Sequence, residues 1–587
     1  MKRILACMLA AALLLTAAAG LAEENDKVIT VATTTLIRGM SFGDMFDGTT
    51  ADNDVKPLLH GADTIIITGS DVDSKMYDIN PDSVEGSAKE TTAKGVKYTF
   101  TLKEDLLWSD GTPMTAQDYV FSVLMQSSSQ MKEQGADIST YDRIVGWKAF
   151  SAGEADTFEG VELIDEQTFS MTIAAEYLPD FYEMSNVWVQ PCPVAVCAPG
   201  CEVKDDGDGA YIEGEWTGDE VMEFITTPAV VSGPYRLDSF DGEAATAEFS
   251  VNPFYCGKIP EIQKLRFMTV NNEDVAGLME DGTVDVFINA VDSDTVKALN
   301  EMKLNKVNYD RRGLAFLALN CESEPLTDVN VRRAIACTID KSEFLQEFLG
   351  GRGSLVRGWY GIGLWMVRDT AAVQETFEYY DEDLWRAKRY LDKSAYVYAE
   401  DGSAYNGSGY RYAKSGDELE KLSLTYFQTE NNRGAQLIGD MLKENCEALG
   451  IELTVREASM TTEALQYYRA EEREYDLMFI ATNFDMVYDP SDEFSTDEDA
   501  QGYGNKSGLK DEKLYQLALD MRSVAAGNRV EYVKRWAEFQ QYFTEILPSV
   551  PLYSNRYTAY WNDSITDFHP EKFDSWGQAI LTTVYAD

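Results

Sequence analysis

Residues 96–122 read VKYTFTLKEDLLWSDGTPMTAQDYVFS, and they predict a strand, a turn and a helix in that order. Aromatic and apolar residues alternate with threonine or lysine over 96–102, which is the period of a half-buried strand. Asp110 and Gly111 predict a tight turn, because glycine tolerates positive φ and aspartate accepts hydrogen bonds from nearby backbone. Thr115 and Asp118 then have the spacing of a helix N-cap and its partner in the first turn.

The same stretch resembles the signature of the oligopeptide- and dipeptide-binding proteins of bacterial ABC importers, which are solute-binding proteins of family 5. There a strand ends in Leu-Arg/Lys, an aromatic-x-Asp-Gly-Thr-Pro turn follows, and a helix opens with Thr-Ala-x-Asp. The matching residues are Leu102, Lys103, Trp108, Asp110, Gly111, Thr112, Pro113, Thr115, Ala116 and Asp118. The resemblance implies an α/β fold of the periplasmic-binding-protein type, with mixed sheets flanked by helices, two lobes around a cleft and an extra small third domain.

Later segments resemble further landmarks of this family, in the family's order. They are 231–237, which has Ser-Gly-Pro-Tyr but lacks the family's first glycine, then 316–341, 484–490 and 547–553. The resemblance covers nearly the whole chain after the N-terminal segment. It implies a lobe I formed by 23–50, 180–312 and 552–587, a small lobe II formed by 51–179, and a lobe III formed by 313–551.

Periodicity predicts the elements between these landmarks. The predicted elements are an alternating strand at 28–32, a hairpin at 161–170, a βαβ unit at 262–287, a strand buried on both faces at 314–320, a second βαβ unit at 422–455 with a helix ended by Gly450, and a buried strand at 475–481. Arg332 and Arg333 lie on a predicted helix, where structural ion pairing is a simpler interpretation than catalysis.

Charge is the extreme feature of the composition. The 587 residues include 50 Lys and Arg against 100 Asp and Glu, a net charge of −50. Such a surface repels nucleic acid and anionic lipid, so neither is expected as a partner. An apolar content of 44% supports sizeable cores, and the length predicts two to four domains.

Residues 1–22 have the pattern of a cleavable signal peptide. Lys2 and Arg3 precede an apolar run at 4–19, and small residues at 20–22 come before Glu23. The sequence therefore predicts an exported, extracytoplasmic protein. A lipid anchor is not expected, because Cys7 has too little apolar sequence before it. The periplasm and the surface of a Gram-positive cell both stay open.

Seven cysteines remain after cleavage at residue 22. Cys192, Cys197 and Cys201 cluster in a Pro/Gly-rich loop, where one local disulfide is expected in an oxidising compartment. A zinc site is disfavoured by the spacings and by the presence of only two histidines. The acidic stretch 204–209 lacks the ligand spacing of a calcium loop, so an acidic surface loop is expected there. The sequence predicts no metal and no cofactor.

The segment that follows the predicted strand 475–481 is the main candidate for ligand contact. Ligands of open α/β sheets bind at the carboxyl ends of strands. In peptide-binding relatives, an Asp four residues before an Asp/Glu-Pro proline pairs with the α-ammonium of the ligand. That place is Met486 here, and Asp485 is one residue away. Because a one-residue slip turns a side chain to the other face, either a local bulge restores Asp485 or this anchor is missing.

The resemblance implies two further groups of candidates. One follows the first strand, where a polar strand end is the alternative, and the other follows a Gly-rich turn, where a packed aromatic loop is the alternative. The predicted ligand-binding residues are Thr34, Thr35, Leu36, Arg357, Trp359, Tyr360, Asn483, Phe484, Asp485, Met486, Tyr488 and Asp489. No catalytic residue is predicted.

Together these features predict a monomeric solute-binding component of an ABC importer that is not an enzyme. It would capture short peptides in an interlobe cleft by pairing with their backbone, with hydrated pockets for the side chains, and would deliver them to permease subunits in the membrane. A non-peptide solute is an alternative for the same fold: a nickel chelate, haem, an oligosaccharide or an opine-like molecule. A chaperone-like or sensory binder and a secreted two-carboxylate hydrolase are further alternatives.

Overall fold

The computed structural model describes residues 27–39, 45–46, 48–67, 76–368, 370–469, 471–496, 504–572 and 575–586. The predicted signal peptide lies outside these residues. Among them, no helix is long and apolar enough to cross a membrane. The chain forms two compact units: unit 1 is built from Met1–Ala290, Asp294–Tyr309 and Tyr557–Asp587, and unit 2 from Val291–Ser293 and Asp310–Arg556. The residues predicted for lobe II fall within unit 1, and their separation from lobe I stays a prediction.

A mixed sheet forms the centre of unit 1. β1 (Val28–Thr33) lies between β12 (Lys264–Thr269) and β13 (Val286–Ala290), parallel to both, and α8 (Val275–Glu280) connects β12 to β13. This confirms the first predicted βαβ unit. β10 (Tyr235–Asp241) and β11 (Thr246–Val251) extend the sheet beyond β12 in antiparallel pairing, and the end of β22 (Ser549–Trp561) pairs with β13.

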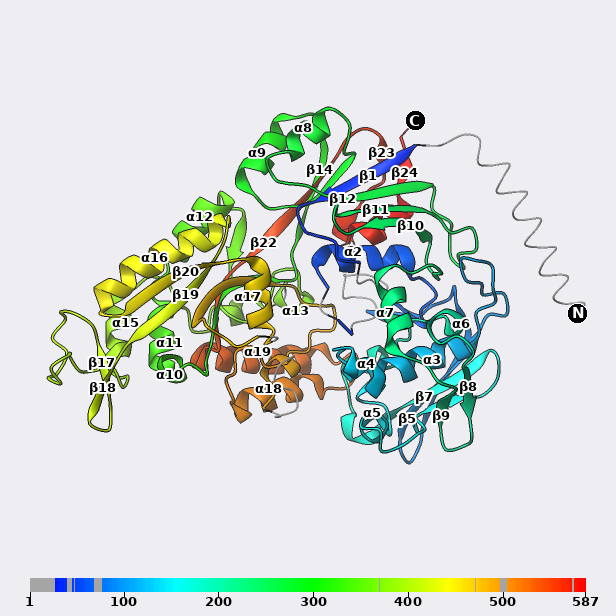
Figure 1. Ribbon diagram of the computed structural model, residues 1–587, viewed down its shortest axis with the longest axis horizontal. Coiled ribbons are helices and arrows are strands. Elements are labelled where there is room, and N and C mark those ends of the chain that lie inside the picture. The colour runs from blue at the N-terminus through cyan, green and yellow to red at the C-terminus, as the bar shows by residue number, and fades with distance from the viewer. Residues whose placement is uncertain are drawn as a thin grey trace, which may run out of the picture. The chain divides into compact units, whose positions relative to one another are not determined.

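Helices cover both faces of this sheet. Ile29 and Val31 pack with α2 (Thr50–Leu59) and α20 (Trp576–Ala579), whereas Ala32 packs with α8 and α9 (Ser293–Glu301). Figure 1 shows α8 and α9 together on one side of β1, with α2 on the other. The alternation of residues 28–32 is therefore not matched by alternating burial: only Val28 of β1 is exposed.

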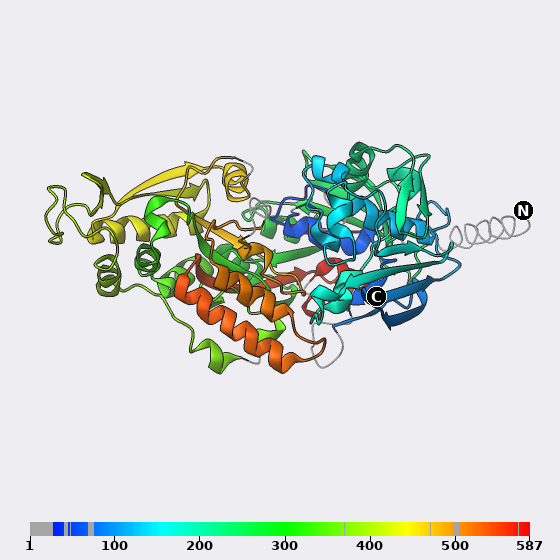
Figure 2. The same ribbon diagram turned by 90° about the horizontal axis from the view of Figure 1, so that it is seen from below.

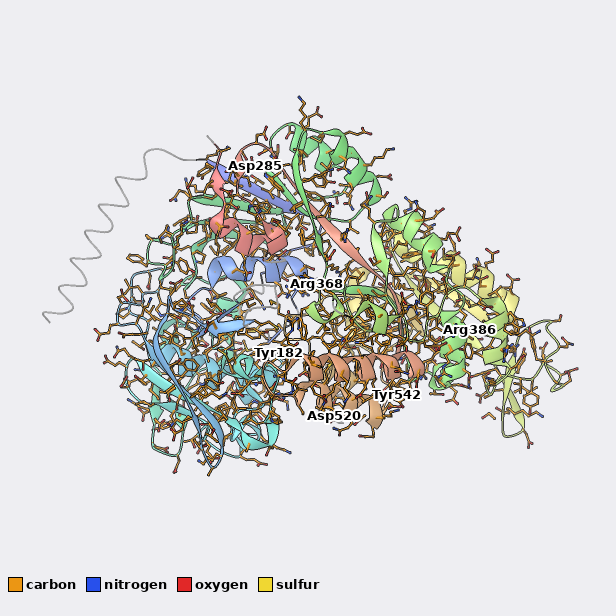
Figure 3. All side chains as sticks on the ribbon, turned by 180° about the vertical axis from the view of Figure 1, so that it is seen from behind. Tyr182, Asp285, Arg368, Arg386, Asp520 and Tyr542 are labelled. Atoms are coloured by element: carbon orange, nitrogen blue, oxygen red, sulfur yellow. The ribbon has the colours of Figure 1, made fainter. Side chains whose placement is uncertain are left out.

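One buried carboxylate connects neighbouring strands of this sheet. Asp285, labelled in Figure 3, accepts hydrogen bonds from the Thr30 N–H (2.9 Å), from Asn562 Nδ2 (3.0 Å) and from Ser564 Oγ (3.0 Å). Its partners come from β1 and from the residues that follow β22, so one side chain connects three segments that are far apart in the sequence.

The opening stretch of the sequence forms the predicted strand, turn and helix in a second sheet of unit 1. β4 (Val84–Thr91), β5 (Gly95–Leu102), β7 (Thr168–Ala174) and β6 (Val161–Leu163) lie in that order, all antiparallel, and β6 and β7 form the predicted hairpin. Burial alternates along β5. Phe100 stacks on Phe169, with ring centroids 5.4 Å apart, and Tyr119 of α3 (Ala116–Gln126) stacks on the same ring at 5.5 Å.

The turn and the cap have the predicted hydrogen bonds. Gly111 has a φ of +83°, and the Thr112 N–H donates to Asp110 Oδ1 (2.9 Å). The Thr115 N–H donates to the carboxylate of Asp118 at 2.9 Å, which completes a capping box at the start of α3. Two sequence landmarks also meet here, because the Ser109 N–H donates to the Val231 carbonyl (3.0 Å) and the Val231 N–H donates to Ser109 Oγ (3.0 Å).

Unit 2 contains the second mixed sheet. β15 (Leu314–Leu319) is buried at all six positions and pairs antiparallel with β21 (Leu477–Thr482) and with the beginning of β22. β19 (Ser423–Thr429) is parallel to β21 and to β20 (Glu452–Ala458). α16 (Arg433–Leu449) connects β19 to β20 and ends at Gly450, whose φ is +79°. The second βαβ unit and the fully buried strand are therefore confirmed.

Several helices surround this sheet. They are α10 (Glu324–Thr327), α11 (Val329–Ala336), α12 (Lys341–Leu349), α15 (Leu384–Leu391), α17 (Met460–Tyr467), α18 (Glu512–Arg522) and α19 (Arg529–Ile546). Figure 2 shows α18 and α19 packed side by side. Asp340 is the N-cap of α12, since its Oδ1 accepts from the Glu343 N–H at 2.7 Å.

The shorter strands form local hairpins and pairs. They are β2 (Ile65–Ile67) with β3 (Tyr77–Ile79), β8 (Glu202–Asp205) with β9 (Ala210–Glu213), β17 (Tyr412–Ser415) with β18 (Glu418–Lys421), and β23 (Ile565–Thr566) with β24 (Val584–Tyr585), while β16 (Gly353–Leu355) pairs with β22. The acidic stretch 204–209 is the β8–β9 turn, where carboxylates accept from backbone N–H groups two residues ahead. It is an acidic surface loop, as predicted.

Arg332 and Arg333 have structural roles, but within the described part of the chain they bind backbone carbonyls and not the carboxylates expected from ion pairing. Arg332 is 2% exposed, and its guanidinium donates to the carbonyls of Leu326 (2.8 Å), Thr327 (3.0 Å), Ile546 (3.1 Å) and Leu547 (3.0 Å). Arg333 donates to the carbonyl of Glu545 at 3.0 Å. These carbonyls lie at the ends of α10 and α19, where helix carbonyls lack partners within the helix, so arginine donors satisfy them.

We expect Arg332→Ala to lower the free energy of unfolding by about 3 kcal/mol, because four carbonyls at helix ends lose a charged donor. Arg333→Ala is the matched control: its side chain is half-buried, and we expect a loss of about 1 kcal/mol or less. Urea unfolding followed by tryptophan fluorescence measures both. Equal losses for the two variants would contradict the role assigned to Arg332.

Candidate ligand-binding segments

The segment 483–489 leaves the sheet of unit 2 at the carboxyl end of β21. Leu314 lies opposite Thr482, so the segment starts beside the residues that precede β15. Arg311 Nε donates to Asn483 Oδ1 at 2.6 Å, and Arg311 Nη2 donates to the Thr482 carbonyl at 3.1 Å. Arg311 Nη1 also reaches Asn555 Oδ1 on β22, at 3.3 Å. Arg311 thus holds the start of the segment. In the sequence it is visible only as a charged residue just before an apolar run, which does not indicate this role.

Close backbone approach shapes the same edge of the sheet. A Cβ atom on Gly313 would lie 1.9 Å from the Thr482 carbonyl oxygen, so this position requires glycine. A Cβ on Gly361 would lie 2.2 Å from the Arg312 carbonyl carbon, and one on Gly363 would lie 2.6 Å from the Asp310 oxygen. Gly361 and Gly363 therefore let the loop that follows Tyr360 lie directly against residues 310–313, whereas Gly313 lets Thr482 and Asn483 approach.

Predicted site residues from two distant segments meet in one aromatic cluster. The Phe484 ring contacts Trp359 and Tyr488 edge to face, with ring centroids 5.7 and 5.3 Å apart. Trp359 also packs on Phe316 of β15 at 4.8 Å. Trp359, Tyr360 and Tyr488 are 4%, 2% and 1% exposed. This is the packed arrangement considered as the alternative for the aromatic loop, and direct contact of these three side chains with a ligand stays a prediction.

A glutamine from α19 fixes this cluster. Gln540 Oε1 accepts from the Trp359 N–H (2.7 Å), and Gln540 Nε2 donates to the Trp359 carbonyl (3.0 Å) and to the Tyr488 hydroxyl (2.9 Å). The Tyr488 hydroxyl in turn donates to the Trp359 carbonyl, and the Tyr532 hydroxyl donates to the Tyr488 carbonyl at 2.8 Å. The polar groups of a buried loop are thereby satisfied. Nothing in the sequence near Gln540 signals this role.

Two of the predicted charged residues have protein partners. Asp489 forms an ion pair with Arg522 of α18 and accepts from Ser491 Oγ at 2.6 Å. Arg357 Nη1 donates to the Glu375 carbonyl at 3.0 Å, and its guanidinium lies 5.0 Å from the centre of the Tyr379 ring. Both side chains fix loops within unit 2 in this structure.

The remaining residues of the segment are more open. Asn483 and Asp485 are exposed, whereas Met486 is half-buried. Of the two positions considered for the ammonium anchor, the acidic one is therefore the one that reaches the surface. The backbone here belongs to no strand, so no register with a neighbouring strand fixes the direction of Asp485.

In unit 1, the predicted residues follow the carboxyl end of β1, where the parallel strands β12, β1 and β13 end at one edge. Thr34 is exposed and Leu36 is 49% exposed. The Thr35 carbonyl accepts from Thr269 Oγ1 at 3.1 Å, and the Leu36 carbonyl accepts from Thr49 Oγ1 at 2.8 Å. An open hollow of about 490 Å³ is lined by residues 268–271 and by α8. It lies next to the hydrogen bond between Thr35 and Thr269. The side chains of Thr34 and Leu36 are thus accessible, as ligand contact requires.

A buried glutamate near the end of β19 was not predicted from the sequence. Glu463 of α17 is 4% exposed, and its Oε2 accepts from Thr429 Oγ1 at 2.6 Å. Its Oε1 has no hydrogen-bond partner among the residues that the structure describes. Burial raises the pKa of Glu463 to about 7, and the bond from Thr429 offsets this only in part.

We expect Glu463 to make the protein less stable as the pH rises from about 4.5 to about 7. The folded state binds this proton more tightly than the unfolded state, so stability is lost as the carboxyl ionises. Glu463→Gln removes this ionisation, and the difference in unfolding free energy between variant and wild type should shift in favour of the variant by up to about 3 kcal/mol between pH 4.5 and pH 8. Urea unfolding at several pH values measures this, and parallel pH profiles would refute it.

Comparison with known proteins identifies the family. The model of "Bacterial extracellular solute-binding proteins, family 5 Middle" matches residues 79–505. The chain is 25% identical over 307 residues to the probable D,D-dipeptide-binding periplasmic protein DdpA of Escherichia coli (strain K12), covering 51% of this chain and 50% of that protein. It is 25% identical over 380 residues to the oligopeptide-binding protein OppA of Lactococcus lactis subsp. cremoris (strain SK11), covering 61% and 57%. These matches span about half the length of the relatives.

Solved structures share the fold over nearly the whole chain. The oligopeptide-binding protein AppA of Bacillus subtilis, in complex with a nonapeptide, has a TM-score of 0.71 at 16% identity, covering 96% of this chain and 99% of that one. Lactococcal OppA, complexed with an endogenous peptide in the closed conformation, has a TM-score of 0.75 at 16% identity, covering 94% and 99%. The predicted α/β binding-protein fold is thus confirmed, and the chain belongs to family 5 of the bacterial extracellular solute-binding proteins.

Proposed function

We propose that the protein is the extracytoplasmic solute-binding component of an ABC importer that captures short peptides and delivers them to permease subunits in the membrane. The match to the family 5 model over residues 79–505 carries this proposal. Relatives named as dipeptide- and oligopeptide-binding proteins support the class of solute. In this proposal the protein is exported through residues 1–22, acts as a monomer and turns over no substrate.

The exposed strand ends favour recognition of a peptide backbone. Asn483 and Asp485 are exposed beyond the carboxyl end of β21, and Thr34 is exposed beyond β1. An extended peptide would pair with main-chain groups at such edges, which gives affinity without reading side chains. Asp485 would hold the α-ammonium of the peptide through a charge-assisted bond.

A non-peptide solute is the second candidate. Met486 stands where peptide-binding relatives carry the acidic anchor, and a thioether cannot pair with an ammonium group. A solute without an amino terminus would not need that anchor. The same exposed edges would then serve a different small molecule.

Native mass spectrometry of protein purified without denaturation tests the proposal. We expect a distribution of added masses that fits short peptides, because backbone recognition accepts many sequences. A single added mass that fits no peptide composition would overturn the peptide assignment in favour of the second candidate. Protein that carries no ligand would be examined with a panel of peptides and other solutes by thermal shift, since a ligand that binds only the native state raises Tm.

We expect Asp485→Ala to weaken peptide binding by about 10- to 100-fold, the loss typical of one charge-assisted contact. Asp417→Ala, in the exposed turn between β17 and β18, is the matched control and should leave the affinity unchanged. Titration calorimetry with a free peptide and with its N-acetylated form separates the roles. If Asp485→Ala weakens both peptides equally, the carboxylate does not read the ammonium group.

A further inference from the structure

Two of the seven cysteines outside the signal peptide lie in direct contact. Cys192 Sγ and Cys197 Sγ are 3.2 Å apart, and both residues are fully buried. Cys197 is the last residue of α6 (Val194–Cys197), a single helical turn that begins directly after Pro193, and Cys192 precedes that proline. Two sulfur atoms at this separation, on residues only five apart, need only a small movement to reach a disulfide bond.

The third cysteine of the cluster is occupied differently. Cys201 Sγ lies 3.5 Å from the carbonyl oxygen of Glu215. A Cβ atom on the facing Gly214 would lie 2.7 Å from this sulfur, so the β9 side of the loop closes around it. The sequence allowed any pairing among the three cysteines, and the geometry singles out Cys192 with Cys197.

The loop that carries this pair is attached to the signature helix. The Cys192 N–H donates to the Asp118 carbonyl at 3.1 Å, and the Val194 N–H donates to Asp118 Oδ1 at 3.2 Å. Asp118 is also the first-turn partner of the N-cap Thr115 in the capping box of α3. A covalent link across this loop would therefore hold in place the N–H groups of Cys192 and Val194, which donate to Asp118.

We propose that Cys192 and Cys197 form a disulfide bond in the exported protein. The proposal rests on the export proposed above, because such bonds persist in oxidising compartments. The Cys192 thiolate attacks one sulfur of an incoming disulfide, carried by a thiol oxidoreductase or by glutathione, and releases the first thiol. The Cys197 thiolate then attacks the mixed disulfide and releases the second, so two protein thiols are oxidised and one disulfide is reduced to two thiols.

Burial sets when this reaction occurs. Burial and the neighbouring Cys197 raise the pKa of the Cys192 thiol well above its usual range. The folded pair is therefore a poor nucleophile and is closed to oxidants, so the bond forms while the loop is still open. Once folded, the disulfide is shielded from reductants in the same way.

Counting thiols in protein refolded with a glutathione redox buffer tests the proposal. The chain without residues 1–22 has seven cysteines, and two in a disulfide leave five that react in denaturant. We expect five, and a proteolytic peptide spanning residues 192–197 that is lighter by two hydrogen atoms. Seven reactive thiols, or a bond that includes Cys201, would overturn the proposal. Because the bond is formed in vitro, this test is independent of peptide capture and of export.

Variants show which sulfurs form the bond. Cys201→Ser retains the proposed pair and should leave four reactive thiols of six, whereas Cys192→Ser and Cys197→Ser should each leave six. We expect loss of the bond in either of the latter variants to lower Tm by about 2–5 °C, because closing so short a loop stabilises the protein only modestly. If a variant fails to fold, peptide mapping of the wild type still decides the question.

Discussion

Unit 2 depends on the pairing of β15 with a neighbour on each side. All six residues of this strand are buried, so its backbone polar groups must be satisfied within the sheet, by β21 and by β22. That requirement fixes Leu314 opposite Thr482 and thereby decides where the chain leaves the sheet. The candidate ligand segment starts at this point, so its place in unit 2 follows from the hydrogen bonding of β15.

Glycines and long polar side chains then complete this edge. Gly313 allows the segment to start against the β15 backbone, and Arg311 connects it to β22. Gln540 satisfies both backbone groups of Trp359 in the loop beside it. Where the backbones approach closely, glycine avoids a steric conflict, and the polar side chains satisfy backbone groups that would otherwise lack a hydrogen-bond partner. In the described segment that follows β21, Asn483 and Asp485 are exposed.

The sequence predicted the fold well because its strongest signals are local. The capping box of α3, the Asp110–Gly111 turn and the hairpin of β6 and β7 each depend on residues a few positions apart. The two βαβ units follow from alternating strand and helix periods. Arg332 shows the limit of such reasoning: its position on a helix indicated a structural role, but only the packing of α11 against the end of α19 revealed that its partners are carbonyls.

By itself, the sequence determined the class of fold and the order of its elements, and it predicted the segments in which a ligand site would form. The tertiary structure decided which side chains of those segments are buried and which are exposed. The reason is the distance along the chain between partners: Arg311 and Asn483 are 172 residues apart, and Trp359 and Gln540 are 181 apart. Periodicity and local spacing carry no information on such pairs, since long-range packing alone brings them together.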